Sequence, residues 1–579
     1  MQTYEAPVRE MLFIMREVAG LDSVLALPGL EEVDAELVAQ VLEEAGRFAK
    51  NELLPLNRIG DLHPARLEDG RVITPPGFAA AWRRFVEGGW NGLVFPPEWG
   101  GQGLPWLLNT AVREIWNSAN LNFDLCPLLT QAGIEALLAH GSEEQKALYL
   151  PKLVPGEWTA AMCLTEPQAG SDVGVARTRA EPRGDHFRIF GQKIFITYGE
   201  HDMAENIVHF VLARLPGAPE GTRGLSLFLV PKFLPDAQGR PGTRNDFRCV
   251  KLEHKLGIHG SPTCVMVYGE REGAVGWLVG EENRGMRCMF TMMNNARIGV
   301  GIEGLGLAEA AYQTARAYAH ERIQGQRDGR RVPIVEHPDV RRMLLGMRAL
   351  TAAMRALCYL AGAETDRAHR HPDEAERRRA EGRVALLTPI VKAWCTDRAV
   401  EICSTAVQVF GGAGFIEETG VAQYYRDVRI TPIYEGTNGI QAKDLVGRKL
   451  TIENGALPWE LFHELEAELP AVEAGAVADL APALRGALGR LREATRILQR
   501  LDGDRREAMA VPYLDAFGAS LGAFLLARGA TRAGSDAAGA AWPGLARFFA
   551  RRILPPALAR LDEPERALEE LDPSLLATS

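Results

Sequence analysis

The sequence predicts a mainly α-helical protein with a central β domain, of barrel or sandwich type, between two helical parts. Three observations predict this order. Apolar residues recur at helical spacing over most of the first 157 residues, short strand-like runs alternate with Gly, Pro and Asp from 158 to 282, and helical spacing returns after Met286. A chain of 579 residues is long enough for several domains. We expect an N-terminal helical extension (1–35), an α-helical domain (36–157), a β domain (158–282), a helical bundle (283–453) and a further helical domain (454–579).

The first 155 residues are predicted to be entirely α-helical. Gly88 and Gly89 end one helix, and the Pro- and Gly-rich run that follows predicts an ordered loop. Ser142 and Gln145 have the spacing of a capping box that begins another helix. We expect helices over 4–17, 32–54, 78–87, 108–117, 128–140 and 143–150.

The pattern changes at Pro155. Runs such as HFRIFGQKIFITYG and NIVHFVLARL, separated by turn residues, predict a compact antiparallel β domain. Beyond it, Gly299, Gly301 and Gly304 match GxGxxG, but no strand precedes them, so we interpret them as small residues that allow close helix packing. We expect helices over 297–321, 340–368, 377–409, 442–452 and 483–501.

Composition excludes several classes of protein. A net charge of −10 and a pI near 5.8 do not favour nucleic acid as the main partner. The sequence has no run of about 18 consecutive apolar residues, so we do not expect integral membrane contact. The N-terminus lacks the apolar run of a signal peptide. The eight cysteines are scattered, without CxxC, and no HExxH occurs, so we expect reduced core thiols and no metal site. These features predict a cytoplasmic protein.

One carboxylate lies at the centre of the most informative stretch, residues 424–449. Glu435 begins the turn EGTNG, and Ile433, Tyr434 and Ile440 flank it. Gly- and Asn-rich turns let a chain pass close to a ligand. Apolar neighbours raise the pKa of a carboxyl toward neutral pH, as a general base requires. The alternative is an ordinary carboxylate beside the positive end of the helix that follows.

Three other motifs accompany this stretch. They are MCLTEPQAGSDV at 162–173, KIFITYG at 193–199 and QVFGGAGF at 408–415. Together with YEGTNGIQ at 434–441, in this order, they resemble the motifs of the acyl-CoA dehydrogenase family, and the resemblance covers about residues 35–450. It implies an α-helical domain, a β domain and a four-helix bundle, with FAD held between the last two and the adjacent subunit.

The resemblance also implies residue roles. Glu435 matches the catalytic base of the family; some relatives carry the base next to the position of Arg297, but Ala296 stands there in this chain. Ser171, Asn294, Arg297 and Glu435 match substrate contacts. The positions that match FAD contacts are Met162, Leu164, Thr165, Ser171, Phe195, Thr197, Arg322, Gln408, Gly412 and Thr437.

The implied reaction is the α,β-dehydrogenation of an acyl-CoA thioester to trans-2-enoyl-CoA. The base removes the α-proton, a hydride passes to flavin N5, and electron-transferring flavoprotein accepts the electrons. The two ends of the chain resemble the long branch of 3-methylmercaptopropionyl-CoA dehydrogenases, so that thioester or a short or medium acyl-CoA is the expected substrate, and a homodimer is favoured over a homotetramer. An acyl-CoA oxidase using O₂ and a flavin-bearing nucleic-acid-binding relative are the alternatives.

Overall fold

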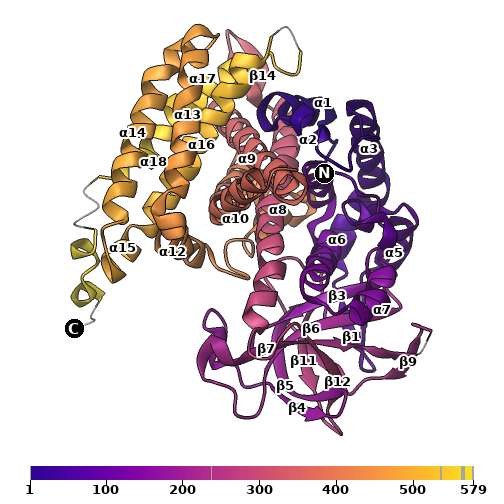
Figure 1. Cartoon of the computed structure of the whole chain (residues 1–579). Helices are drawn as coiled ribbons and strands as arrows, with labels where there is room; N and C mark the ends of the chain where they lie inside the picture. Colours follow the sequence, from indigo (N-terminus) through magenta and orange to yellow (C-terminus); the bar gives the residue numbers. More distant parts are fainter. Residues whose placement is uncertain (1, 237, 535–536, 563–566, 577–579) are drawn as a thin grey trace. The chain divides into compact units, whose positions relative to one another are not determined.

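The computed structural model describes residues 2–236, 238–534, 537–562 and 567–576 (Figure 1). The chain forms two compact units, each assembled from separate stretches of sequence. Unit 1 is drawn from Met1–Arg47, Pro105–Ser118 and Arg297–Ser579, and unit 2 from Phe48–Leu104 and Ala119–Ala296. Helices α6 (Trp106–His140) and α8 (Gly285–Glu321) have residues in both units.

Unit 2 contains the predicted β domain. Its main sheet has eight strands in the order β10-β11-β5-β12-β7-β6-β3, with β4 paired to β5 and β6. Apolar side chains such as Ile189, Val211, Phe228 and Val230 fill its core. The strands are β3 (Trp158–Cys163), β4 (Arg179–Arg183), β5 (His186–Thr197), β6 (Asn206–Arg214), β7 (Leu225–Pro231), β10 (Phe247–Leu252), β11 (Thr263–Tyr268) and β12 (Ala274–Val279), and β8 (Phe233–Pro235) pairs separately with β9 (Pro241–Arg244).

Two expectations for this part of the chain were wrong. The sheet is not wholly antiparallel, because β3 and β6 pair in parallel from Trp158↔Asn206 to Cys163↔Val211. The first 155 residues are not wholly helical, because β1 (Arg66–Glu68) and β2 (Arg71–Ile73) form a hairpin. The remaining elements of unit 2 are helical: η2 (Ala49–Leu53), α4 (Leu54–Leu62), α5 (Phe78–Glu87), η3 (Trp90–Gly92), η4 (Pro97–Trp99), α7 (Glu143–Leu153), η5 (Val173–Val175) and η6 (Gly221–Gly224).

The elements that the structure describes in unit 1 are helical apart from the hairpin β13 (Ile323–Arg327) and β14 (Arg330–Pro333). Its longest elements, α9 (Pro338–Arg370) and α10 (Glu374–Phe410), pack against each other, and the C-terminal helix α16 (Ala510–Arg532) packs on both. Figure 1 shows the C-terminal helices, in orange and yellow, gathered around α16. The other elements are α1 (Val8–Ile14), η1 (Met15–Ala19), α2 (Leu21–Leu25), α3 (Ala35–Phe48), η7 (Ile334–Glu336), η8 (Gly411–Phe415), η9 (Glu417–Thr419), α11 (Val421–Val428), α12 (Asn438–Gly447), η10 (Lys449–Gly455), α13 (Leu457–Ala474), η11 (Ala478–Leu480), α14 (Ala481–Leu498), α15 (Gly503–Ala508), α17 (Trp542–Arg552), α18 (Leu554–Ala559), η12 (Glu569–Leu571) and η13 (Pro573–Leu576).

The GxGxxG run lies inside α8 and packs closely on α10. A Cβ added to Gly301 would stand 2.5 Å from Cγ1 of Val391, and one added to Gly304 would stand 3.2 Å from the carbonyl oxygen of Cys395. Real Cβ atoms do not approach so closely without displacing their neighbours. The prediction of close helix packing, in place of a dinucleotide fingerprint, is therefore confirmed.

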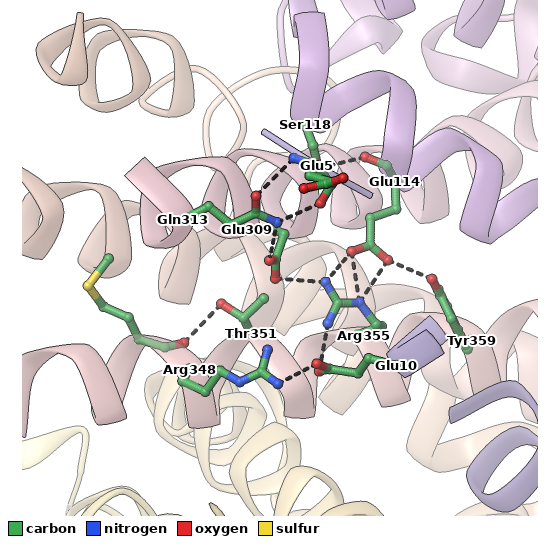
Figure 2. Close-up of polar contacts among 11 residues, drawn as sticks. Glu5, Glu10, Glu114, Ser118, Glu309, Gln313, Arg348, Thr351, Arg355 and Tyr359 are labelled. Carbon is green, nitrogen blue, oxygen red and sulfur yellow. Dashed lines mark hydrogen bonds and ion pairs between the residues drawn. The ribbon is translucent and has the colours of Figure 1, made fainter. Parts of the chain in front are cut away.

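A buried ion network joins four helices of unit 1 (Figure 2). The fully buried guanidinium of Arg355 on α9 donates to Glu10 of α1 at 3.0 Å, to Glu114 of α6 at 2.8 Å and to Glu309 of α8 at 2.8 Å. The hydroxyl of Tyr359 donates to Glu114 at 2.7 Å. Each charge is thus paired inside the protein, which is the condition under which charged groups are tolerated away from water.

Several findings bear on the expected class of protein. All eight cysteines are buried free thiols. In the part of the chain that the structure describes, no three His, Cys, Asp or Glu side chains gather in a way that could hold a metal ion. Helices α9 and α16 are long and apolar enough to cross a membrane, but 78% and 89% of their most apolar windows are buried, as in core helices.

Candidate functional site

In unit 2, a buried ion pair organises the loop of the first motif. The Lys193 ammonium donates to the Glu166 carboxylate at 2.8 Å and to the carbonyl of Leu164 at 2.8 Å, and its side chain is fully buried. Glu166 also accepts from the Thr178 hydroxyl at 2.6 Å and from the Arg177 amide at 2.7 Å. Burial raises the pKa of Glu166, but Lys193 and these hydrogen bonds outweigh it and lower the pKa to about 2. The Glu of TEP is therefore the ionised anchor of this loop.

The second motif lies directly against the first. The Ile194 amide donates to the carbonyl of Thr165 at 2.9 Å. Opposite Val265 the register of β5 shifts, and Phe195 takes a left-handed backbone with φ of 60°. The Phe195 side chain is 59% exposed. A bulge that re-aims a large aromatic side chain into the open, at a backbone angle rare for such a residue, is typical of a ligand-facing position.

The other predicted residues of unit 2 differ in exposure. Leu164 is buried, Met162, Thr165 and Thr197 are half-buried, and Ser171 is exposed. Asn294, the predicted substrate contact on α8, is exposed. The structure therefore brings the first two motifs together and leaves several of their polar groups accessible.

In unit 1, the predicted base lies in a tight loop that leads into α12. The Tyr434 amide donates to the carbonyl of Ile430 at 3.0 Å, and the Asn438 amide donates to that of Pro432 at 3.0 Å. The Glu435 side chain is 25% exposed, and its Oε1 accepts from Nη2 of Arg297 at 3.4 Å.

The electrostatic setting of Glu435 favours a partly desolvated base. Burial raises the pKa of this carboxyl, against the opposing charges of Arg297 and Lys392. The positive end of a helix would lower the pKa instead. Burial is the larger effect here, because it outweighs the charges of Arg297 and Lys392.

Two contacts fix the loop around Glu435. Gly436 has a φ of 68°, and a Cβ added there would stand 2.5 Å from Nε2 of Gln441 and 3.0 Å from Nε of Arg297, so a side chain at this position would be strained and would displace both groups. The hydroxyl of Tyr434 donates to the fully buried carboxylate of Glu303 on α8. Arg297, predicted to contact CoA, is here held beside the base.

The remaining predicted residues of unit 1 lie on several elements, and most of them are exposed. Thr437 caps α12, with its hydroxyl accepting from the Ile440 amide at 3.3 Å. Gln408, Gly412 and Arg322 are exposed, and a Cβ added to Gly412 would meet nothing within 4 Å. Open space over a Gly-rich turn leaves room for a ligand to approach the backbone.

Four charged residues that contact these motifs or their neighbours were not predicted from the sequence. They are Glu166 and Lys193 in unit 2, and Glu303 and Lys392 in unit 1. Glu166 and Lys193 lie inside the quoted motifs, but their pairing joins residues 27 apart in sequence. No local pattern signals such a contact.

Comparison with known proteins decides the family. Family models described as acyl-CoA dehydrogenase N-terminal, middle and C-terminal domains match residues 36–157, 161–270 and 283–450, and an acetyl-CoA dehydrogenase C-terminal-like model matches 461–577. A 3-methylmercaptopropionyl-CoA dehydrogenase from Ruegeria pomeroyi is 53% identical over 458 residues, which cover 78% of this chain and 77% of that protein. The chain belongs to the acyl-CoA dehydrogenase family.

A further relative and two solved structures are also similar to this chain. A butyryl-CoA dehydrogenase from Syntrophomonas wolfei is 35% identical over 78% of this chain and 76% of its own length. The structure of Caenorhabditis elegans ACDH-11 in complex with C11-CoA matches with a TM-score of 0.82 at 21% identity, over 99% of this chain and 95% of that one. An acyl-CoA dehydrogenase from Bacillus anthracis, complexed with FAD, matches with a TM-score of 0.75 at 22% identity, over 98% and 93%. The predicted fold class, including the helical C-terminal extension, is confirmed.

Proposed function

We propose that this protein is an FAD-dependent acyl-CoA dehydrogenase that converts an acyl-CoA thioester to its trans-2-enoyl-CoA, with Glu435 as the base. The observation that carries the proposal is the Glu435 carboxyl, whose pKa burial raises, in the YEGTNGIQ loop of a member of this family. Thioester α-protons are weakly acidic, so a base with a raised pKa in a site shielded from water suits their removal.

The residues present fit FAD. In unit 2 the exposed ring of Phe195 and the accessible hydroxyls of Thr165, Ser171 and Thr197 suit a planar polar ring system. Bound FAD supplies the acceptor for the β-hydride, chemistry that no side chain offers. The residues that we propose to hold it are Met162, Leu164, Thr165, Ser171, Phe195, Thr197, Arg322, Gln408, Gly412 and Thr437.

Glu435 removes the α-proton and holds it on its carboxyl group. Arg297, 3.4 Å away, stabilises the ionised carboxylate before the reaction. We assign Ser171, Asn294 and Arg297 to the CoA portion of the substrate, as the resemblance implies. We also assign to the backbone amide of Glu435 the polarisation of the thioester oxygen, as in an oxyanion hole.

The acyl group that we propose is 3-methylmercaptopropionyl, because the Ruegeria pomeroyi relative that carries this name is 53% identical. A short linear acyl group such as butyryl is the second candidate, because relatives named butyryl-CoA dehydrogenase are 35% identical. The proposed electron acceptor is electron-transferring flavoprotein, and the proposed location is the cytoplasm. We also propose the five-part domain division given by the sequence.

We propose a homodimer. Phe415 is 88% exposed and Ile416 is 51% exposed, directly after the Gly-rich turn at the end of α10. Adjacent large apolar side chains exposed in this way favour a subunit contact. Multi-angle light scattering of wild type and of Phe415→Ser tests this, because the substitution should weaken a dimer and leave a monomer unchanged.

The experiment that tests the function is an anaerobic titration of the purified flavoprotein with a panel of acyl-CoAs. The proposal expects loss of the oxidised flavin band and formation of the enoyl-CoA, fastest with 3-methylmercaptopropionyl-CoA. Rapid peroxide formation from substrate and O₂ alone would support the acyl-CoA oxidase alternative. A protein that holds FAD, reacts with no thioester and shifts DNA at physiological salt would support the nucleic-acid-binding alternative.

A further inference from the structure

A buried lysine contacts the start of α12, directly after the loop that carries Glu435. Lys392 on α10 is fully buried, which is rare for lysine unless its charge has partners. Its ammonium donates to Oδ1 of Asn438 at 2.8 Å. Asn438 is the first residue of α12, three positions after Glu435.

Asn438 clamps the start of α12 onto α10. Its side-chain amide donates to the carbonyl of Ala393 at 3.1 Å, to the hydroxyl of Thr396 at 2.9 Å and to the carboxylate of Asp397 at 2.8 Å. With the bond from Lys392, both polar atoms of this side chain are hydrogen-bonded to residues 392–397 of α10. The C-terminal helix α16 packs on both α10 and α12, which supports this junction from a further side.

The charge of Lys392 acts on the base as well. The ammonium lowers the pKa of the Glu435 carboxyl, opposing burial. Burial in turn lowers the pKa of Lys392 to about 7, while Asp397 on α10, Glu303 on α8 and Glu435 raise it and Arg297 on α8 lowers it further. A cation beside a carboxylate favours its ionised, proton-accepting form.

We propose that Lys392 is a positioning residue for the base: through Asn438 it holds the Glu435 loop on α10, and its ammonium favours the ionised form of the carboxylate. This inference rests on the proposed function. Lys392 need not touch the substrate, since both effects pass through residues of the protein.

The test uses the holoenzyme and the variants Lys392→Met and Asn438→Ala. Lys449→Met is the matched control, because Lys449 is also buried but pairs with Asp444 at the far end of α12. Flavin content and circular dichroism establish that each variant is folded.

The first readout is the pH dependence of flavin reduction by an acyl-CoA that reduces the wild type. Without the ammonium, Glu435 should lose its proton less readily. In Lys392→Met the acid limb of the pH–rate profile, where the rate rises as Glu435 ionises, should therefore move to higher pH by about one unit. In Asn438→Ala the charge remains, so the rate should fall while the acid limb moves less. Lys449→Met should retain the wild-type limb.

The second readout, hydrogen–deuterium exchange of residues 430–441, does not depend on activity. Both Lys392→Met and Asn438→Ala should exchange these amides faster than wild type. Unchanged exchange and an unchanged acid limb in Lys392→Met would overturn the inference, and so would faster exchange confined to Asn438→Ala. A wild type that no thioester reduces would overturn the proposed function instead, and the exchange result would still decide whether Lys392 holds the loop.

Discussion

Replacing Lys193 by Met should destabilise unit 2 and weaken its hold on FAD. The change removes the partner of Glu166, whose side chain is only 4% exposed, and the donor to the Leu164 carbonyl. The size of this loss of stability follows from two separate arguments. Removing one partner of a buried pair costs about 3–5 kcal/mol. The pKa of Glu166, about 2 in place of 4.5, corresponds to about 3 kcal/mol.

Differential scanning calorimetry of the apoprotein measures this effect. A loss of about 3 kcal/mol should lower the thermal unfolding midpoint of a unit of about 150–250 residues by about 6–12 °C. Lys251→Met is the control in the same β domain, since Lys251 is 64% exposed in its pair with Glu253 and such pairs contribute less than about 1 kcal/mol. Equal midpoints for the two variants would refute the role given to Lys193.

The sign of the pH dependence gives an independent check on the same pair. Because folding lowers the pKa of Glu166, its contribution is present above the unfolded pKa and is lost as the pH falls from about 4.5 toward 2. The difference in midpoint between wild type and Lys193→Met should therefore be full at neutral pH and shrink below about pH 4.5. A difference that grew on acidification would contradict this.

Two further predictions concern the packing of unit 1. Arg355→Met leaves the buried carboxylates of Glu114 and Glu309 without their shared partner, so it should cost about 3–5 kcal/mol in thermal unfolding. Arg330→Met, which removes an Arg that is 70% exposed, should cost less than about 1 kcal/mol; a similar loss in both would argue against the buried network. Gly301→Ala forces a Cβ to within 2.5 Å of Val391 and should cost about 1–3 kcal/mol. Gly486→Ala, in α14 with nothing within 4 Å, should be neutral or stabilising; a stabilising Gly301→Ala would show that α8 and α10 are not closely packed there.

Local patterns predicted most of the element order, and the resemblance of the motifs predicted the fold class. They also contained a signal that the sequence analysis did not use. Asp69-Gly70 and Asp328-Gly329 each form the turn of a hairpin, with φ values of 49° and 75° in the first and 51° and 76° in the second. An Asp-Gly dipeptide is a strong hairpin signal, because both turn residues need positive φ. Both hairpins were therefore predictable.

Other features depend on tertiary packing and have no local signature. The parallel pairing of β3 with β6 joins strands that two others separate in the chain. Arg355 meets Glu10 across 345 positions of sequence, and Lys392 meets Asn438 across 46. From sequence alone, a charged residue in a helical pattern is predicted to lie on a solvent-exposed helix face. The same limit applies to Glu166, Lys193 and Glu303.

The most direct test of the central claim is single-turnover flavin reduction by an acyl-CoA under anaerobic conditions, in wild type and in Glu435→Gln. Glu418→Gln is the control, because Glu418 is an exposed carboxylate in η9 of the same unit. If Glu435 is the base, its replacement should slow reduction by at least about 10²–10⁴-fold while FAD remains bound, and Glu418→Gln should match wild type. Reduction of Glu435→Gln at the wild-type rate would show that another group removes the α-proton.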